Sequence, residues 1–131
     1  MNGKKDMILE WVRLADLDLL TANHMLAHHP VPIEIICFHA QQAGEKMLKY
    51  FLVTKNIEPP KIHDLQILLE MCIKFDSGFS ALSKESVVLT PYGVMPRYPA
   101  DHDIDEHDAE AAIKCANKIR DFVNGIVSTD S

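Results

Sequence analysis

The residues of this chain with the most suggestive chemistry are an arginine and a histidine in a proline-rich segment. Arg97 and His102 frame the run Arg97-Tyr98-Pro99-Ala100-Asp101-His102. A neutral imidazole can take the proton of a ribose 2′-hydroxyl, and a guanidinium can hold a phosphate and stabilise the charge that develops on it. Asp101 could orient the imidazole. The pair would suit RNA cleavage without a metal ion; alternatively, Arg97 pairs with an acidic residue of the last helix and His102 is a solvated loop residue.

A second candidate site is the polar face of the helix that we expect around residues 32–56. His39, Gln42 and Lys46 stand at positions i, i+3 and i+7, so they share one helix face. Glu45 and Lys49 extend this polar set. The face could line a site for a nucleotide or a phosphate. The alternatives are a solvated face or part of a subunit interface.

The remaining histidines do not predict a metal site. His24 and His28 are four residues apart, a spacing that can place two imidazoles on one ion. A second cluster contains His102, Asp103 and His107. Neither cluster supplies convincing third and fourth ligands, so we expect no bound metal. We also expect no cofactor, because no glycine-rich phosphate loop follows a strand. His63 precedes a helix start and is interpreted as a hydrogen-bonded residue, with a functional role as the alternative.

The apolar residues recur with helical periodicity along nearly the whole chain, which predicts an all-α protein. In the first 26 residues the stripe steps by three or four: Ile8, Val12, Ala15, Leu19, Ala22 and Leu26. Similar stripes follow after Pro32, after Asp64 and after Asp105, with a short helix between Phe79 and Leu89 and a loop over residues 90–103. The expected fold is an up-and-down bundle of four to five helices, with consecutive helices antiparallel.

Helix boundaries and small residues refine this expectation. Asp64 suits a helix start, because its carboxylate can accept hydrogen bonds from unpaired amides. Asn56 suits a left-handed helix end, and Pro59-Pro60 prevents continuation. Ala40, Ala43 and Gly44 would let another helix approach closely, and we expect them to pack against a symmetry mate in a dimer.

The composition excludes several classes of protein. The chain has 131 residues with 13 Lys+Arg and 19 Asp+Glu, a formal net charge of −6. This charge excludes a broad basic surface for duplex nucleic acid, so any RNA contact must be local. Three cysteines in apolar surroundings indicate buried thiols in a reducing compartment. No apolar run is long enough for a membrane span, and we expect a single cytoplasmic domain over residues 1–131, with its core at about residues 6–127.

Four sequence blocks together resemble the HEPN family, named for higher eukaryotes and prokaryotes nucleotide-binding. The first runs from Trp11 to Leu19 and the last is Arg97-Tyr98-Pro99. Between them lie Cys37-Phe38-His39-Ala40-Gln41-Gln42-Ala43-Gly44-Glu45-Lys46-Met47-Leu48-Lys49 and Lys55-Asn56-Ile57-Glu58-Pro59-Pro60-Lys61-Ile62-His63-Asp64-Leu65. In family order, the blocks and the final helix cover the chain from about Trp11 to Val127.

The resemblance implies a helical bundle that forms a two-fold homodimer in the cytoplasm of a prokaryote. It also implies a minimal nucleotidyltransferase as partner, because family members are often encoded beside one. Some members are metal-independent ribonucleases of toxin–antitoxin or RNA-defence systems, with an Arg-x4-6-His active site. On this chain that motif corresponds to Arg97 and His102, although Tyr98 and Ile104 depart from the pattern of the ribonucleases.

The main hypothesis is a dimer that binds a nucleotide or RNA phosphate beside a nucleotidyltransferase partner. Its binding residues would be Arg97, Tyr98, His39, Gln42, Lys46 and Lys49. The first alternative is a metal-independent endoribonuclease toxin with Arg97, His102 and Asp101 as catalytic residues. The second is a non-catalytic scaffold whose surface binds another protein.

Overall fold

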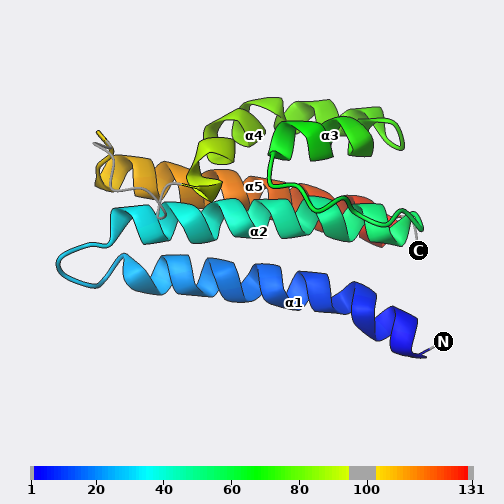
Figure 1. Ribbon diagram of the computed structural model, residues 1–131, viewed down its shortest axis with the longest axis horizontal. Coiled ribbons are helices and arrows are strands. Elements are labelled where there is room, and N and C mark those ends of the chain that lie inside the picture. Colours follow the sequence, from blue (N-terminus) through cyan, green and yellow to red (C-terminus); the bar gives the residue numbers. More distant parts are fainter. Residues whose placement is uncertain (1, 95–102, 130–131) are drawn as a thin grey trace.

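The computed structural model describes residues 2–94 and 103–129, and the described residues are almost entirely helical (Figure 1). The five α-helices are α1 (Asn2–Met25), α2 (Ile33–Thr54), α3 (Leu65–Ile73), α4 (Ser83–Leu89) and α5 (Glu106–Thr129). Two 3₁₀ helices, η1 (Ser77–Leu82) and η2 (Thr90–Gly93), flank α4. The predicted all-α bundle is confirmed. The expected loop over residues 90–103 differs at its start, where η2 forms a further helical turn.

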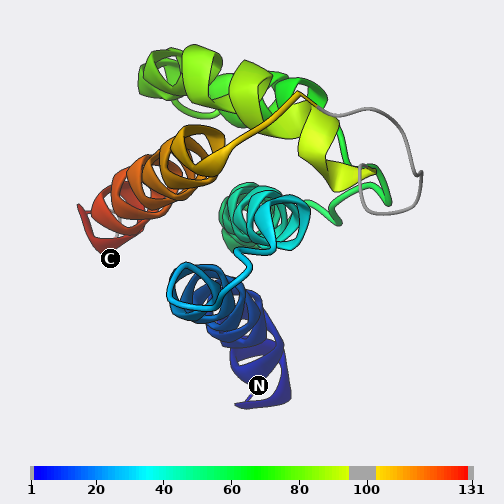
Figure 2. The same cartoon turned by 90° about the vertical axis from the view of Figure 1, so that its left-hand side faces the viewer.

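Helix α2 occupies the centre of the bundle, as the end-on view in Figure 2 shows. It packs against α1 on one side, α5 on another, and α3, α4 and η2 on a third. A helix surrounded in this way must be apolar over most of its circumference. This explains why Ile36, Met47, Leu48 and Phe51 of α2 are all fully buried, although they do not lie on one narrow stripe.

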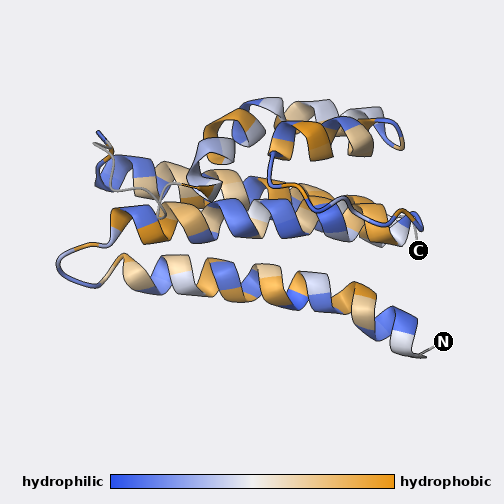
Figure 3. Cartoon of the chain, in the orientation of Figure 1, coloured by the Kyte–Doolittle hydropathy of each residue, from blue (hydrophilic) through white to orange (hydrophobic). Residues whose placement is uncertain are grey.

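The long outer helices follow the stripes expected from the sequence. In α1, Ala15, Leu19 and Ala22 are buried. In α5, the small residues Ala109 and Ala112 are buried near the start of the helix. Figure 3 shows that hydrophilic residues separate the apolar ones along α1. Within the described residues, no helix has both the length and the apolar character that a membrane span requires.

Local sequence signals set the helix boundaries around the connection between α2 and α3. Asn56 has a φ of 61°, the left-handed conformation that asparagine tolerates at a helix end. The side chain of Asp64 caps α3 by accepting hydrogen bonds from the backbone N–H of Gln66 at 2.8 Å and of Ile67 at 3.4 Å. Both predicted boundary roles are therefore confirmed.

The path of the chain between α2 and α3 differs from the expectation. Helices α1 and α2 are antiparallel, but residues 55–64 turn back along α2, so that α3 runs in the same direction as α2 (Figure 1). The hydrogen bond from the backbone N–H of Leu65 to Thr90 Oγ1, at 3.2 Å, fixes the start of α3 against η2. Ten residues are enough for this return, whereas a short connection would have forced an antiparallel pair.

The small residues of α2 serve the core of this chain and not a symmetry mate, which corrects the sequence interpretation. Ala40 and Ala43 are fully buried. A Cβ added to Gly44 would lie 3.1 Å from Leu65 Cδ2 and 3.2 Å from the Cδ1 atoms of Ile119 and Leu89. Side chains of α3, α4 and α5 therefore pack closely against α2 at Gly44. The prediction of close packing was right, but its partner was wrong.

A cluster of aromatic side chains packs where η1 meets α2 and α5. Phe79 is fully buried between Phe51 and Phe122, with ring centroids 4.5 Å and 5.0 Å away. Phe75, which the sequence places on the inner stripe of α3, follows the helix and is 47% exposed. Its ring meets the edge of the cluster through Phe51 at 6.4 Å. The aromatic contacts tie η1 to α2 and α5.

We expect Gly44→Val to destabilise the protein. The two added methyl groups and the Cβ would meet three buried side-chain ends that have no free space, which typically costs about 1–3 kcal/mol. The matched control is Gly125→Val in the last turns of α5, where nothing lies within 4 Å of an added Cβ. It should change the free energy of unfolding by less than about 0.5 kcal/mol. Urea unfolding of both variants tests this, and equal effects would contradict the packing described for α2.

Candidate functional site

Four of the predicted site residues lie outside the described residues. They are Arg97, Tyr98, Asp101 and His102. The described chain stops at Val94 and resumes at Asp103. The site can therefore be built from the side chains of α2 and from the two elements that bound this segment, η2 and the start of α5.

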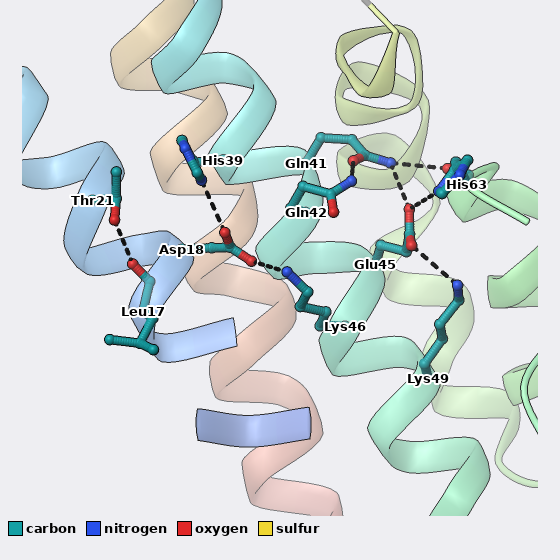
Figure 4. A network of polar contacts seen from close by, with 10 residues as sticks. All are labelled: Leu17, Asp18, Thr21, His39, Gln41, Gln42, Glu45, Lys46, Lys49 and His63. Atoms are coloured by element: carbon teal, nitrogen blue, oxygen red, sulfur yellow. Dashed lines mark hydrogen bonds and ion pairs between the residues drawn. The ribbon is translucent and has the colours of Figure 1, made fainter. Parts of the chain in front are cut away.

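The first polar cluster joins α1 to α2 through Asp18 (Figure 4). One carboxylate oxygen of Asp18 lies 2.9 Å from His39 Nδ1, and the other lies 2.5 Å from Lys46 Nζ. The Asp18 side chain is only 11% exposed, while the His39 side chain is 28% exposed. The carboxylate therefore orients the imidazole and balances the charge of the lysine at a helix interface.

The second polar cluster surrounds Glu45, whose side chain is 6% exposed. Its Oε2 accepts a hydrogen bond from Lys49 Nζ at 3.0 Å, and its Oε1 lies 3.0 Å from His63 Nδ1. Gln41 Nε2 donates to the same Oε1 at 3.2 Å (Figure 4). A buried carboxylate needs this number of partners, because burial without them would cost several kcal/mol. The cluster joins α2 to the segment before α3.

The sequence assigned His39, Gln42, Lys46 and Lys49 to one binding face, and the structure divides them between the two clusters. His39 and Lys46 meet at Asp18. Gln42 Nε2 instead donates to Gln41 Oε1 at 2.8 Å, while Lys49 is 8% exposed and points to Glu45. Both lysines thus have a carboxylate partner. The face consists of oriented polar groups whose charges are already balanced.

Gln41 connects the second cluster to the segment that contains Arg97. Its side chain is fully buried, and its Nε2 also donates to the backbone carbonyl of His63 at 2.9 Å. Gly93, the last residue of η2, packs directly on this amide: a Cβ on Gly93 would lie 3.1 Å from Gln41 Cδ. A larger residue at this position would have to displace the Gln41 amide by a few tenths of an ångström. The chain therefore leaves η2 from a fixed position beside the polar side chains of α2.

The other boundary of this segment is fixed by the acidic start of α5. Asp105 Oδ1 accepts hydrogen bonds from the backbone N–H of His107 at 2.9 Å and of Asp108 at 3.2 Å. The Asp105 N–H donates to Asp108 Oδ2 at 2.9 Å, which completes a reciprocal cap. The hydrogen bond from the Asp108 backbone, followed by that from His107, lowers the pKa of Asp105. The predicted acidic first turn is confirmed.

Three ionisable side chains, in η2, α2 and α4, have shifted pKa values. Burial raises the pKa of Tyr92 in η2 to about 12, and the pKa of Cys37 in α2 to about 12. Both groups are therefore protonated at neutral pH. Burial alone would raise the pKa of Glu85, but the hydrogen bond from Lys118 Nζ, at 2.9 Å, brings it below its ordinary value. The Glu85–Lys118 ion pair joins α4 to α5.

Sequence reasoning missed two residues that organise the site. Asp18 lies beside the apolar stripe of α1 and was not singled out, although a carboxylate next to Leu19 in a packed helix signals a buried partner. Gln41 was quoted only as part of a motif. Gln41 could have been identified from its position on the buried side of α2, because a buried amide needs hydrogen-bond partners. Among the described residues, no three His, Cys, Asp or Glu side chains are arranged to hold a metal ion.

We expect Gln41→Leu to lower the free energy of unfolding by about 1–3 kcal/mol, because the change leaves the buried Glu45 carboxylate and the His63 carbonyl each without one donor. The matched comparison is Gln42→Leu, which removes a half-buried amide and leaves one acceptor, Gln41 Oε1, without a donor, so it should cost less than Gln41→Leu, which leaves two. Urea denaturation measures both. A Gln41 variant as stable as the Gln42 variant would contradict the role assigned to Gln41.

Solved structures and a family model resemble this chain. No curated protein matches the chain. The crystal structure of ST0689, an archaeal HEPN homologue, superimposes with a TM-score of 0.73 at 24% identity, covering 92% of this chain and 97% of that one. The crystal structure of TT1696 from Thermus thermophilus gives a TM-score of 0.74 at 27% identity, covering 95% and 98%. The HEPN domain model matches residues 8–126. The chain therefore belongs to the HEPN domain family.

Proposed function

We propose that this protein is a helical dimer that binds a nucleotide or an RNA phosphate and works with a minimal nucleotidyltransferase partner. The observation that supports this most directly is the anchoring of the chain on both sides of Arg97. Gly93 packs on the buried Gln41, and the capped first turn of α5 holds Asp105. The segment between these fixed points carries Arg97 and Tyr98, and it starts beside a helix whose polar side chains are already oriented.

In this proposal Arg97 supplies the charge that binds the phosphate, because a guanidinium can donate two parallel hydrogen bonds to it. His39 and Gln42 supply further donors and acceptors from α2. Lys46 is 21% exposed and forms an ion pair with Asp18, so it can contact a phosphate only while it keeps this ion pair. Lys49 acts indirectly, since it is buried against Glu45 and balances the carboxylate that positions Gln41.

A dimer is the simplest way for an acidic protein to bind an anion locally. A two-fold axis that brings two Arg97 residues together doubles the local positive charge against the net charge of −6. The outer face of α1 offers an apolar surface for such an assembly. Leu9, Leu17 and Leu20 are 49%, 44% and 65% exposed, and all three belong to this helix.

We expect Leu20→Glu to weaken the dimer by about tenfold or more, because it places a charge in the apolar patch of α1. The matched control is Val87→Glu on α4, where an apolar side chain is also 53% exposed. Light scattering coupled to size exclusion, over a range of protein concentrations, reports the mass of both variants. A dimer that dissociates with Val87→Glu and not with Leu20→Glu would place the interface on α4 instead.

The second candidate function is a metal-independent ribonuclease, which the Arg97-x4-His102 spacing favours. His102 would take the proton of the ribose 2′-hydroxyl, and Asp101 would orient its ring. The 2′-oxygen would then attack the neighbouring phosphorus, and the bond to the 5′-oxygen would break. The departing oxygen takes up a proton, and the other product is a 2′,3′-cyclic phosphate. Arg97 would stabilise the charge on the phosphoryl oxygens.

The test combines RNA binding and RNA cleavage in excess EDTA. The wild-type protein should bind single-stranded RNA saturably, and Arg97→Ala should weaken binding by about tenfold or more, the usual effect of losing a direct phosphate contact. Arg13→Ala, which removes an exposed arginine paired with Glu10, is the matched control and should bind normally.

The RNA cleavage assay distinguishes the ribonuclease from the binding module. Cleavage that disappears in both His102→Ala and Arg97→Ala would establish the ribonuclease, whereas cleavage that persists in His102→Ala would indicate a contaminating enzyme. Binding without cleavage supports the binding module. A well-folded wild-type protein that binds neither nucleotide nor RNA at low salt would contradict both functions and leave the non-catalytic scaffold, which should then retain a protein partner through purification.

A further inference from the structure

A groove on the described surface lies at the end of the bundle where α1 begins and α2 ends, away from the start of α5. Helix α1 diverges from α2 toward its N-terminus, as Figures 1 and 2 both show. The groove has a volume of about 540 Å³ and is bounded by the first three turns of α1, the last turns of α2 and the Pro59-Pro60 segment. Such a volume is in the range that encloses one small organic ligand.

The floor of the groove is apolar and contains one aromatic ring. Trp11 is the single tryptophan of the chain, and it lies half-buried against the core beside Ile8. Val53 and Ile57 complete the apolar lining from α2 and the following segment. An indole face at the edge of a groove is a platform on which a flat heteroaromatic ring can stack.

Ammonium groups surround this floor. Lys4 Nζ donates to the neutral side-chain oxygen of Asn56 at 2.9 Å, so this contact fixes the lysine without balancing its charge. Lys61 also lines the groove and is exposed. Lys49 also lines the groove, but its charge is balanced by Glu45. Glu58 is the single carboxylate of the lining, so Lys4 and Lys61 make the groove attractive to an anion on an otherwise acidic protein.

A second hollow on the surface of α1 shows the opposite charge. It has a volume of about 440 Å³ and also touches Trp11 and Met7, but its polar lining is Asp6 and Glu10, of which Glu10 is paired with Arg13, so that Asp6 supplies the unbalanced negative charge. An aromatic ligand without charge could use either hollow. An aromatic ligand that carries a phosphate is repelled by the acidic hollow and attracted by the groove, so the charges select both the ligand class and the location.

We propose that this groove binds a nucleoside phosphate, with its base stacked on Trp11 and its phosphates between Lys4 and Lys61. The inference rests on the proposed nucleotide-binding function, and it adds a site for a nucleoside phosphate apart from the segment that contains Arg97. Asn56, whose side-chain oxygen accepts a hydrogen bond from Lys4, supplies an amide that can hydrogen-bond the sugar or the base when Lys4 turns to the phosphate.

Tryptophan fluorescence tests the proposal directly, because Trp11 is the sole tryptophan. Titration of the intact protein with ATP should change the emission saturably. The double variant Lys4→Glu/Lys61→Glu should raise the Kd by about tenfold or more, since it replaces two attractive contacts with repulsive ones. Lys74→Glu, an exposed lysine at the end of α3, is the matched control and should leave the Kd unchanged.

Tripolyphosphate carries the anionic part of ATP without the base, so it should bind far more weakly and without a fluorescence change. Equal affinity for both anions would overturn the stacking on Trp11. Calorimetry can also detect ATP binding at another place. If Arg97→Ala abolishes that binding and the Lys4/Lys61 variant retains it, the groove site is overturned while the proposed function stands. If ATP binds to no variant while RNA still binds, the groove proposal also fails.

Discussion

The buried carboxylate of Glu45 organises the connection between α2 and α3. Its side chain is 6% exposed and needs partners within the protein, and three groups meet it: Gln41 and Lys49 of α2 and His63 of the segment before α3. These contacts hold the segment before α3 against the centre of α2. Because Gly93 packs on Gln41, the same cluster also fixes the end of η2. One buried charge thus determines both the path of the chain after α2 and the starting point of the segment that contains Arg97.

Internal charge balance also limits where this protein can bind an anion. The lysines of α2 are paired with Asp18 and Glu45, and Arg120 of α5 pairs with Asp16 of α1 at 2.7 Å. These pairs join helices, so they contribute to specific packing more than to ligand affinity. In a chain with a net charge of −6, these pairs leave the lysines of α2 with little unbalanced charge for a ligand. We therefore propose Arg97 and the Lys4–Lys61 groove as the places where an anion binds.

The sequence predicted those features that depend on neighbours along the chain. Asp64 caps α3 and Asn56 ends α2 as expected, since capping depends on residue type and on the next three amides. It did not predict which elements cover Gly44, because the position of α3 depends on the return of residues 55–64 along α2. It also did not predict that His39 and Lys46 meet Asp18, because this depends on how α1 packs against α2. Helical periodicity gives the side of a helix that is buried, and only the tertiary arrangement decides what buries it.

The proposed function requires this HEPN protein to bind a phosphate-bearing ligand through a small number of cations. Calorimetric titration with single-stranded RNA and with ATP, repeated over a series of salt concentrations, measures this binding. We expect saturable binding whose affinity falls as salt rises, with a shallow slope that corresponds to a few phosphate contacts. Absence of binding to either ligand at the lowest salt concentration, by protein that is folded and dimeric, would contradict it.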